Sequence, residues 1–305
     1  MDVSRLRTLR ELADRHTMAA VAEALFLTPS AVSQQISQLE QEMGVQLIER
    51  QGRGVRLTSA GKRLVSHADR LFTVIGEAMS DMAAIKKEVA GMLTVAVFPT
   101  AGTSLLPAAI HLVQERYPHL QVVLEEMEPS EGLAALGAWR CDLAFVDDLA
   151  TEEHRAGRKK IEKIALIDDA LFALLPADHR LAGKLSVSVS ELKDERWALD
   201  SAWSSFADFV RGLCRQSGYE PNINAYCRGF EILAAMVSEG CSVSIVAGLR
   251  LRYPTQRVAA VKLRPEVKRR ISVAYRSGER EHPAIEAFLE ALTESVKLHR
   301  RAMKR

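Results

Sequence analysis

Short polar side chains recur along one side of residues 29–42. They are Ser30, Ser33, Gln34, Gln35 and Gln38. Hydroxyl and amide groups both donate and accept hydrogen bonds, so this set can meet the edges of DNA bases or phosphate oxygens. A helix face that only contacts solvent more often carries Lys and Glu. The composition of this face therefore favours contact with nucleic acid.

Three short helices are expected to position this polar face. Apolar residues at helical spacing predict helices over 5–15 and 17–25, and Thr28 begins a third. Thr28 can cap that helix, and Pro29 fits its first turn because the missing N–H is not needed there. The short connection 26–28 is the tight turn of a helix-turn-helix.

A basic hairpin is expected to follow these helices. Residues 47–57 form two short extended runs that flank a glycine-containing tip, the pattern of a β-hairpin. Its arginines, Arg50, Arg53 and Arg56, suit a wing that lies on the phosphate backbone. Together with Thr28 and the five polar residues of the preceding helix, they complete the predicted DNA-contacting set.

A long helix with an apolar seam is predicted over residues 59–88, which contain no proline. Leucine and other apolar or small residues recur there at alternating spacings of four and three, which is a heptad pattern. The seam contains Leu64, Leu71, Ile75, Ala78, Met82 and Ile85. Two copies of the chain would hide it by packing together, so the seam favours dimerisation; packing on the rest of the chain is the alternative.

Several stretches between Ala19 and Gly61 resemble the signature of LysR-type transcriptional regulators. They include Ala22-Glu23-Ala24-Leu25, Ser30-Ala31-Val32-Ser33, Leu47-Ile48-Glu49-Arg50 and Leu57-Thr58-Ser59-Ala60-Gly61. The resemblance implies that the polar face of the third helix enters the major groove of double-stranded DNA in promoter regions. It also implies a homodimer or homotetramer, with RNA polymerase as a further candidate partner. Pro29 departs from the family, which often has Gln there.

The C-terminal two hundred residues alternate strands and helices, which predicts an α/β fold with largely parallel sheets. In such sheets ligands bind beyond the carboxyl ends of strands, where helix N-termini also point. The candidate effector-binding residues are Thr100, Ala101, Gly102, Thr103, Ser201, Ser204 and Phe230, with Asp147 as a partner for an amine. An anionic or zwitterionic effector would suit them. Ordinary helix capping and a solvated acid are the alternative interpretations.

The resemblance to LysR-type regulators continues through this region. It implies two α/β subdomains like those of periplasmic binding proteins, the first over 92–166 and 267–300 and the second over 167–266, with an effector cleft between them. The predicted organisation is thus a mostly α winged helix-turn-helix over 1–58, a linker helix over 59–90 and an effector domain over 91–305. Trp139 stands where the family commonly has glycine, and Ala247 where it commonly has proline.

The sequence lacks the signatures of an enzyme. It contains no nucleophile elbow, phosphate-binding loop, dinucleotide fingerprint or zinc-protease motif, and its eight histidines have no partners at metal-ligand spacing. We therefore expect no catalytic residues, no metal and no cofactor. The absence of a signal peptide and of a long apolar run places the protein in the cytoplasm, without a membrane partner.

Two other functions remain open from the sequence. A pair such as Cys214 and Cys227 could sense oxidation, although cysteines of this kind are more often small buried apolar residues. A DNA-associated protein that senses nothing is the other alternative, but it would leave the C-terminal two hundred residues without a purpose.

Overall fold

The computed structural model describes residues 2–52, 54–86, 89–149, 161–252 and 257–302. At its N-terminus, three helices and a hairpin form a winged helix-turn-helix: α1 (Val3–Arg15), α2 (Met18–Leu25), α3 (Pro29–Met43), β1 (Ile48–Gln51) and β2 (Gly54–Leu57). Thr17 and Thr28 cap α2 and α3, accepting hydrogen bonds from the backbone N–H groups of Ala20 and Ala31. Leucines of α1 and the apolar face of α3 close the core of this domain.

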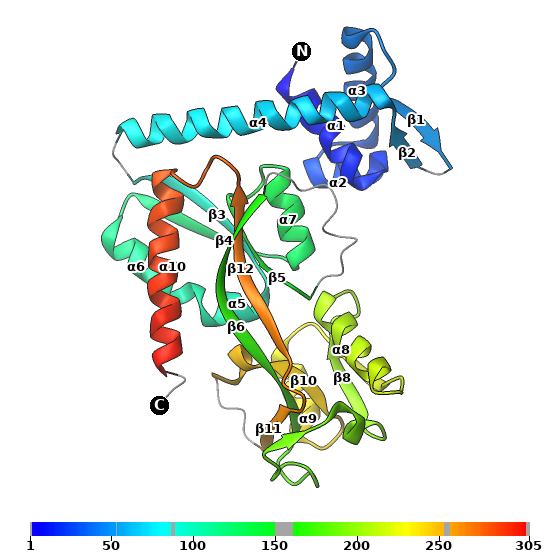
Figure 1. The fold of residues 1–305 in the computed structure, drawn as a ribbon, viewed down its shortest axis with the longest axis vertical. Coiled ribbons are helices and arrows are strands. Elements are labelled where there is room, and N and C mark those ends of the chain that lie inside the picture. Colours follow the sequence, from blue (N-terminus) through cyan, green and yellow to red (C-terminus); the bar gives the residue numbers. More distant parts are fainter. Residues whose placement is uncertain (1, 53, 87–88, 150–160, 253–256, 303–305) are drawn as a thin grey trace.

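Helix α4 (Ser59–Lys86) leaves the winged domain and runs along one side of the rest of the molecule (Figure 1). Its first part belongs to the DNA-binding domain, since Ala68 is buried and Leu64 packs against that core. Further along, Leu71, Ile75, Ala78, Met82 and Ile85 are exposed. The predicted seam is therefore divided between an intramolecular part and a solvent-facing part.

The C-terminal region contains two subdomains joined by long strands (Figure 1). Subdomain I is built from β3 (Gly91–Val97), α5 (Pro99–Ser104), α6 (Leu106–Arg116), β4 (Leu120–Glu126), α7 (Pro129–Gly137), β5 (Leu143–Asp147) and α10 (Pro283–Ala302). Subdomain II is built from β7 (Ser186–Val187), η2 (Val189–Leu192), β8 (Arg196–Asp200), α8 (Ser205–Gln216), β9 (Asn222–Cys227), α9 (Phe230–Ser238), β10 (Ser244–Ala247), η3 (Gly248–Arg252) and β11 (Val258–Leu263). Two strands connect the subdomains. Strand β6 (Ile161–Pro176) pairs with β10, β11 and β12, and strand β12 (Lys268–Arg276) also pairs with β5.

The sheets are mixed, which corrects the expectation of largely parallel sheets. Strands β3, β4 and β5 are parallel neighbours, as are β8 and β9. The long strand β6 instead pairs antiparallel with β12, β10 and β11, and β12 also pairs antiparallel with β5. The physical reason is that the chain crosses between the subdomains on β6 and returns on β12, so the two crossing strands run in opposite directions.

Other elements also differ from the sequence-based expectation. The sequence predicts a helix over 104–116, which corresponds to α6, and the structure adds the separate short helix α5 before it. Strands β7, β8, β9 and β11 were not predicted from the sequence. Strand β9 alternates exposed and partly buried residues, and Asn222 and Asn224 occupy two of its first three positions, so it carries little of the apolar signal that marks a strand.

Candidate DNA-contact surface and ligand cleft

The polar residues of α3 divide into two groups. Ser30, Ser33 and Gln34 are exposed, as is the capping Thr28. Gln35 is partly buried, and its side-chain oxygen accepts a hydrogen bond from the hydroxyl of Thr8 on α1. Gln38 is also partly buried. The exposed group is therefore free to meet a duplex, whereas Gln35 holds two helices of the domain together.

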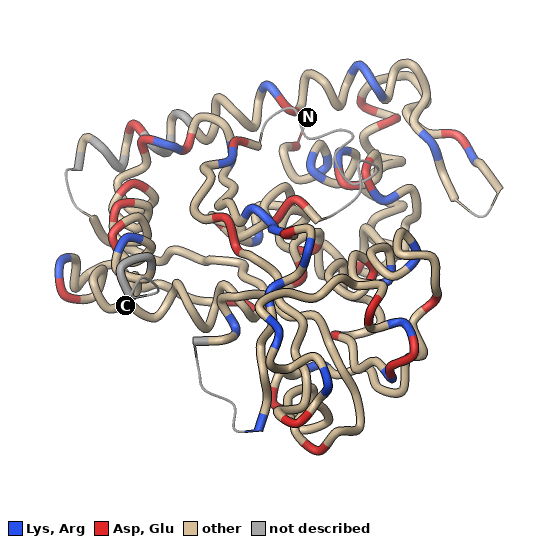
Figure 2. Tube along the Cα trace, turned by 60° about the horizontal axis from the view of Figure 1, so that its bottom comes forward, with Lys and Arg blue, Asp and Glu red and all other residues tan. Residues whose placement is uncertain are grey.

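The hairpin β1–β2 projects from the winged domain and carries both basic and acidic residues (Figure 2). Arg50 is exposed. Arg56 pairs with Glu49 directly across the hairpin, with 2.8 Å between Nε and the carboxylate oxygen. Arg53 lies outside the described residues.

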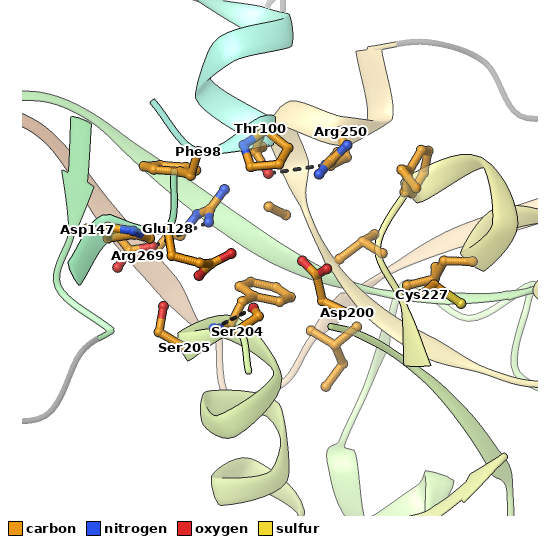
Figure 3. A pocket seen from close by; sticks show the side chains of 18 of the residues that line it. Phe98, Thr100, Glu128, Asp147, Asp200, Ser204, Ser205, Cys227, Arg250 and Arg269 are labelled. Atoms are coloured by element: carbon orange, nitrogen blue, oxygen red, sulfur yellow. Dashed lines mark hydrogen bonds and ion pairs between the residues drawn. The ribbon is translucent and has the colours of Figure 1, made fainter. Parts of the chain in front are cut away.

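A cleft of about 610 Å³, including solvent at its mouth, lies between the two subdomains (Figure 3). The first residues of α5, α7, α8 and α9 meet around it, because each helix follows a strand that ends at the cleft. Its lining comes from both subdomains and contains Phe98, Pro99, Thr100, Glu128, Pro129, Asp147, Asp200, Ser204, Ser205, Phe206, Cys227, Gly229, Phe230, Leu233, Ile245, Val246, Ala247, Arg250 and Arg269.

The structure brings four of the expected effector-binding residues together at this cleft: Thr100, Asp147, Ser204 and Phe230. The other four, Ala101, Gly102, Thr103 and Ser201, are not in its lining. Ala101 is fully buried beneath the cleft, and the Thr103 hydroxyl donates to carbonyl oxygens one turn earlier in its own helix. The Ser204 hydroxyl accepts hydrogen bonds from the first backbone N–H groups of α8 and thus acts as a helix cap.

Arg269 sits at the base of the cleft in a network of buried charges. Its guanidinium lies 3.0 Å from Asp169 and 3.5 Å from Asp147, and all three side chains are at most 3% exposed. The ring centroids of Phe98 and Phe206 lie 5.1 and 5.4 Å from the Arg269 Cζ atom. Arg269 was not predicted as a cleft residue because it stands in the basic run 268–270, whose other members face solvent.

Arg250 enters the cleft from η3 of subdomain II. Its Nε donates to the hydroxyl of Thr100 in subdomain I at 3.1 Å, and its guanidinium lies over the ring of Phe230 at 5.5 Å. Burial lowers the pKa of this arginine from its ordinary value. The side chain therefore bridges the subdomains while its terminal nitrogens remain in a partly desolvated space.

Glu128 and Asp200 bring two carboxylates toward each other from opposite subdomains (Figure 3). Burial and the nearby charge of Asp200 raise the pKa of Glu128 to about 7. Burial also raises the pKa of Asp200. Neither acid was predicted from the sequence, although Asp200 ends β8 and Glu128 directly precedes α7, which are positions where a cleft residue is expected.

Three of the four cysteines lie in environments that suppress thiolate formation. Cys141, Cys214 and Cys227 are buried, and Cys227 lines the cleft. Burial raises the pKa of all three thiols, that of Cys141 to about 12. Cys241 is exposed.

The described part of the chain contains neither a metal-binding cluster nor a membrane span. No group of three or more His, Cys, Asp or Glu side chains in those residues could hold a metal ion. None of the helices described is both long and apolar enough to cross a bilayer.

A winged helix-turn-helix followed by a long helix and a two-lobed domain with a central cleft defines a class of ligand-responsive DNA-binding regulators. Comparison with known families places the chain within that class. The family described as "Bacterial regulatory helix-turn-helix protein, lysR family" matches residues 3–62, and "LysR substrate binding domain" matches residues 86–297. The chain belongs to the LysR family of transcriptional regulators.

Individual relatives are similar along nearly their whole length. The chain is 27% identical to a "Hydrogen peroxide-inducible genes activator" of Dickeya chrysanthemi, covering 98% of this chain and 97% of the relative. It is 26% identical to the "Transcriptional dual regulator GltC" of Bacillus subtilis (strain 168), covering 95% and 96%.

Solved structures share the fold. A full-length OxyR variant of Pseudomonas aeruginosa is 24% identical with a TM-score of 0.64, covering 98% of this chain and 95% of that one. Full-length CbnR in complex with its target DNA is 24% identical with a TM-score of 0.55, covering 97% and 100%.

Proposed function

We propose that this LysR-family regulator binds a small zwitterion in its cleft and binds promoter DNA through α3 and the hairpin. The observation that carries the ligand class is the separation of unlike charges across the cleft. Glu128 and Asp200 face each other on one side, and Arg250 stands on another (Figure 3). The proposal contains no catalytic step.

An ammonium group would supply the cation that Glu128 does not find among the described residues, whereas the charges of Arg250 and Arg269 already act on Asp200. The charge of Arg269 is already matched by Asp169 and Asp147, so it contributes little attraction to a ligand. Burial is the largest cause of the raised pKa of Glu128, and repulsion by the facing Asp200 carboxylate adds to it. A cation placed between them would relieve that repulsion and bind both subdomains at once.

An acidic group is the partner for Arg250. Its Nε donates to Thr100, and within the described part of the chain its terminal guanidinium nitrogens make no hydrogen bond, so they can donate to a ligand oxygen. The N-terminus of α9 begins beside it at Gly229, which has no side chain to cap the first N–H groups. Backbone N–H groups and the helix dipole there favour a negative charge.

A matched set of ligands tests this assignment. Thermal-shift titration would use α-amino acids, the corresponding amines without the carboxylate, and the corresponding acids without the amine. We expect stabilisation by members of the first set only. Asp200→Asn and Arg250→Gln should each weaken binding of the α-amino acid that stabilises the native protein. Asp208→Asn and Arg215→Gln, which change exposed residues of α8 outside the cleft lining, should not. Binding of the acids alone, with no requirement for the amine, would contradict the proposal.

The DNA-binding half is tested by salt dependence. Arg50→Ala removes an exposed charge from the hairpin and should reduce the slope of log K against log salt by about one. Lys193→Ala removes an exposed charge from subdomain II and should leave the slope unchanged. Equal slopes for the native protein, Arg50→Ala and Lys193→Ala would show that the hairpin lies outside the DNA interface.

Peroxide sensing is a second candidate function, favoured by similarity to relatives named hydrogen peroxide-inducible genes activators. The burial of Cys141, Cys214 and Cys227 argues against it, because a protonated, inaccessible thiol reacts slowly with oxidants. A peroxide-dependent change in the DNA footprint that Cys214→Ser or Cys227→Ser abolishes would establish this alternative. An unchanged footprint in the native protein would exclude it.

A further inference from the structure

Trp139 occupies a backbone position that normally requires glycine. It follows the last turn of α7, and its φ is +61°. The N–H of Trp139 donates to Leu136 O at 3.2 Å and the N–H of Arg140 to Ala135 O at 2.9 Å. This is the Schellman arrangement, in which the left-handed residue is usually glycine. A tryptophan is strained there, so its side chain must make contacts that hold it in place.

The Trp139 side chain enters the DNA-binding domain of the same chain. It packs against the core of that domain, with its ring centroid 6.3 Å from that of Phe72 on α4. Gly76, one turn further along α4, packs closely against this contact. A Cβ atom there would lie 3.6 Å from the Trp139 ring and 3.3 Å from the Glu279 side chain.

Arginines of both domains approach this ring, and the Cζ atom of Arg7 on α1 lies 6.0 Å from its centroid. Arg276 of β12 lies 4.3 Å from the ring centroid and is fixed by Glu279, Asp142 and two carbonyl oxygens. Arg10 of α1 pairs with Asp69 and donates to Gly137 O at 2.5 Å. We call Trp139 and these contacts with α1 and α4 the Trp139 socket.

The socket also reaches the turn that precedes the DNA-contacting helix. The guanidinium of Arg140 lies 4.5 Å from the ring centroid of Phe26, which is 78% exposed and connects α2 to α3. The orientation of α3 relative to subdomain I is therefore set by contacts on α1, on α4 and at the turn before α3 itself.

Three elements of subdomain I have one end at the cleft and the other at the socket. Helix α7 has Glu128 before its first residue and Trp139 after its last. Strand β12 carries Arg269 and Arg276, and the segment through β5 runs from Asp142 to Asp147. Asp147 pairs with Arg269 at the cleft, whereas Asp142 pairs with Arg276 at the socket.

We propose that the Trp139 socket docks the DNA-binding domain on subdomain I of the same chain, and that α7, β5 and β12 pass changes in the cleft to it. Docking stands on the socket contacts alone. The coupling to a ligand rests on the proposed function, because it requires that the cleft be occupied and emptied.

Crosslinking in the full-length protein tests docking. Phe26→Cys with Arg140→Cys, in a Cys241→Ser background that removes the exposed native thiol, places one cysteine on each domain. A short bismaleimide should join them within one chain. We expect Trp139→Gly to lower that yield at least fivefold, since glycine keeps the turn but loses the contacts. Trp203→Ala, which removes an 87% exposed tryptophan, should leave the yield unchanged. A low yield in the parent protein, or an equal yield after Trp139→Gly, would overturn docking.

The same crosslink tests the coupling. Asp147→Asn changes the cleft end of β5 without altering its size, and we expect the crosslinking yield to change at least twofold. Asp148→Asn, at the exposed neighbouring position, is the control. An unchanged yield in Asp147→Asn would overturn the coupling and leave docking intact. None of these measurements uses a cleft ligand, so they stand or fall separately from the zwitterion proposal.

Discussion

Arg269 and Asp169 are direct cross-strand partners on β12 and β6, with both side chains about 3% exposed. The next cross-strand pair, Arg270 and Asp168, has the same chemistry at 2.9 Å but faces solvent, with side chains 60% and 53% exposed. Successive residues of a strand point to opposite faces of the sheet, so one pair forms the base of the cleft while its neighbour lies on the surface.

These neighbouring pairs should differ sharply in their effect on stability. Arg269→Met leaves Asp169 buried without its counter-charge and should lower the free energy of unfolding by about 3–5 kcal/mol. Arg270→Met breaks an exposed pair and should cost about 0–1 kcal/mol. Guanidinium chloride denaturation of both variants measures the difference. Similar losses for the two would show that the Arg269 network is well hydrated.

Glu128 should make the stability of the ligand-free protein depend on pH. Its pKa in the folded chain is about 7, against an ordinary value of 4.5. A carboxyl with a raised pKa contributes stability below its unfolded pKa, and this is lost as pH rises through the folded pKa. The contribution of Glu128 should therefore make the melting temperature decrease as pH rises from about 5 to about 8. Glu128→Gln should flatten this part of the profile. An identical profile in the variant would place Glu128 in contact with bulk water.

The two neighbouring glutamines of α3 should separate DNA contact from folding. Gln34→Ala, at an exposed position, should reduce discrimination between DNA sequences by about 1–3 kcal/mol and leave stability unchanged. Gln35→Ala removes the hydrogen bond between α1 and α3, leaving the Thr8 hydroxyl only the Ser4 carbonyl oxygen of its own helix as acceptor, and should destabilise the domain by about 1 kcal/mol. Competition binding and thermal denaturation distinguish the two effects; loss of stability in Gln34→Ala would contradict the assignment.

The exposed part of α4 should carry the contact between copies of the chain. Met82 and Ile85 are 56% and 71% exposed, so their replacement by Lys should not damage the fold of one chain. A charged residue in an apolar seam is costly when two helices bury it, and the oligomer should dissociate at micromolar concentration. Sedimentation of Met82→Lys with Ile85→Lys measures this. The exposed Lys62→Glu, near the start of the helix, is a control for added charge.

Local patterns gave the winged domain closely because its elements depend on nearby residues. Thr28 and Pro29 mark the start of α3 whatever the rest of the chain does, and the structure begins the helix there. The same locality could not show that Gln35 contacts Thr8, since that depends on how α1 packs. The spacing of apolar residues predicted which side of the helix faces the core, but it could not predict which contact each side chain makes.

The cleft was harder to predict because its residues come from segments far apart in the chain. Thr100 and Arg250 are 150 positions apart and meet only because β6 and β12 bring the subdomains together. Arg269 appears in the sequence as one of several surface-like basic residues. Trp139 was marked as a departure from its family, but only the fold shows what the departure contacts.

The continuity of β6 and β12 through both subdomains has a mechanical consequence. A loop hinge would let the subdomains rotate freely. Two hydrogen-bonded strands resist bending instead, because the deformation is shared among many hydrogen bonds. Their register shifts between Ile271 and Ser272, where the ribbon is most easily bent, and that point lies between Arg269 and Arg276. Closing the lobes would therefore store elastic energy in the ribbon, and the ligand's departure would release it.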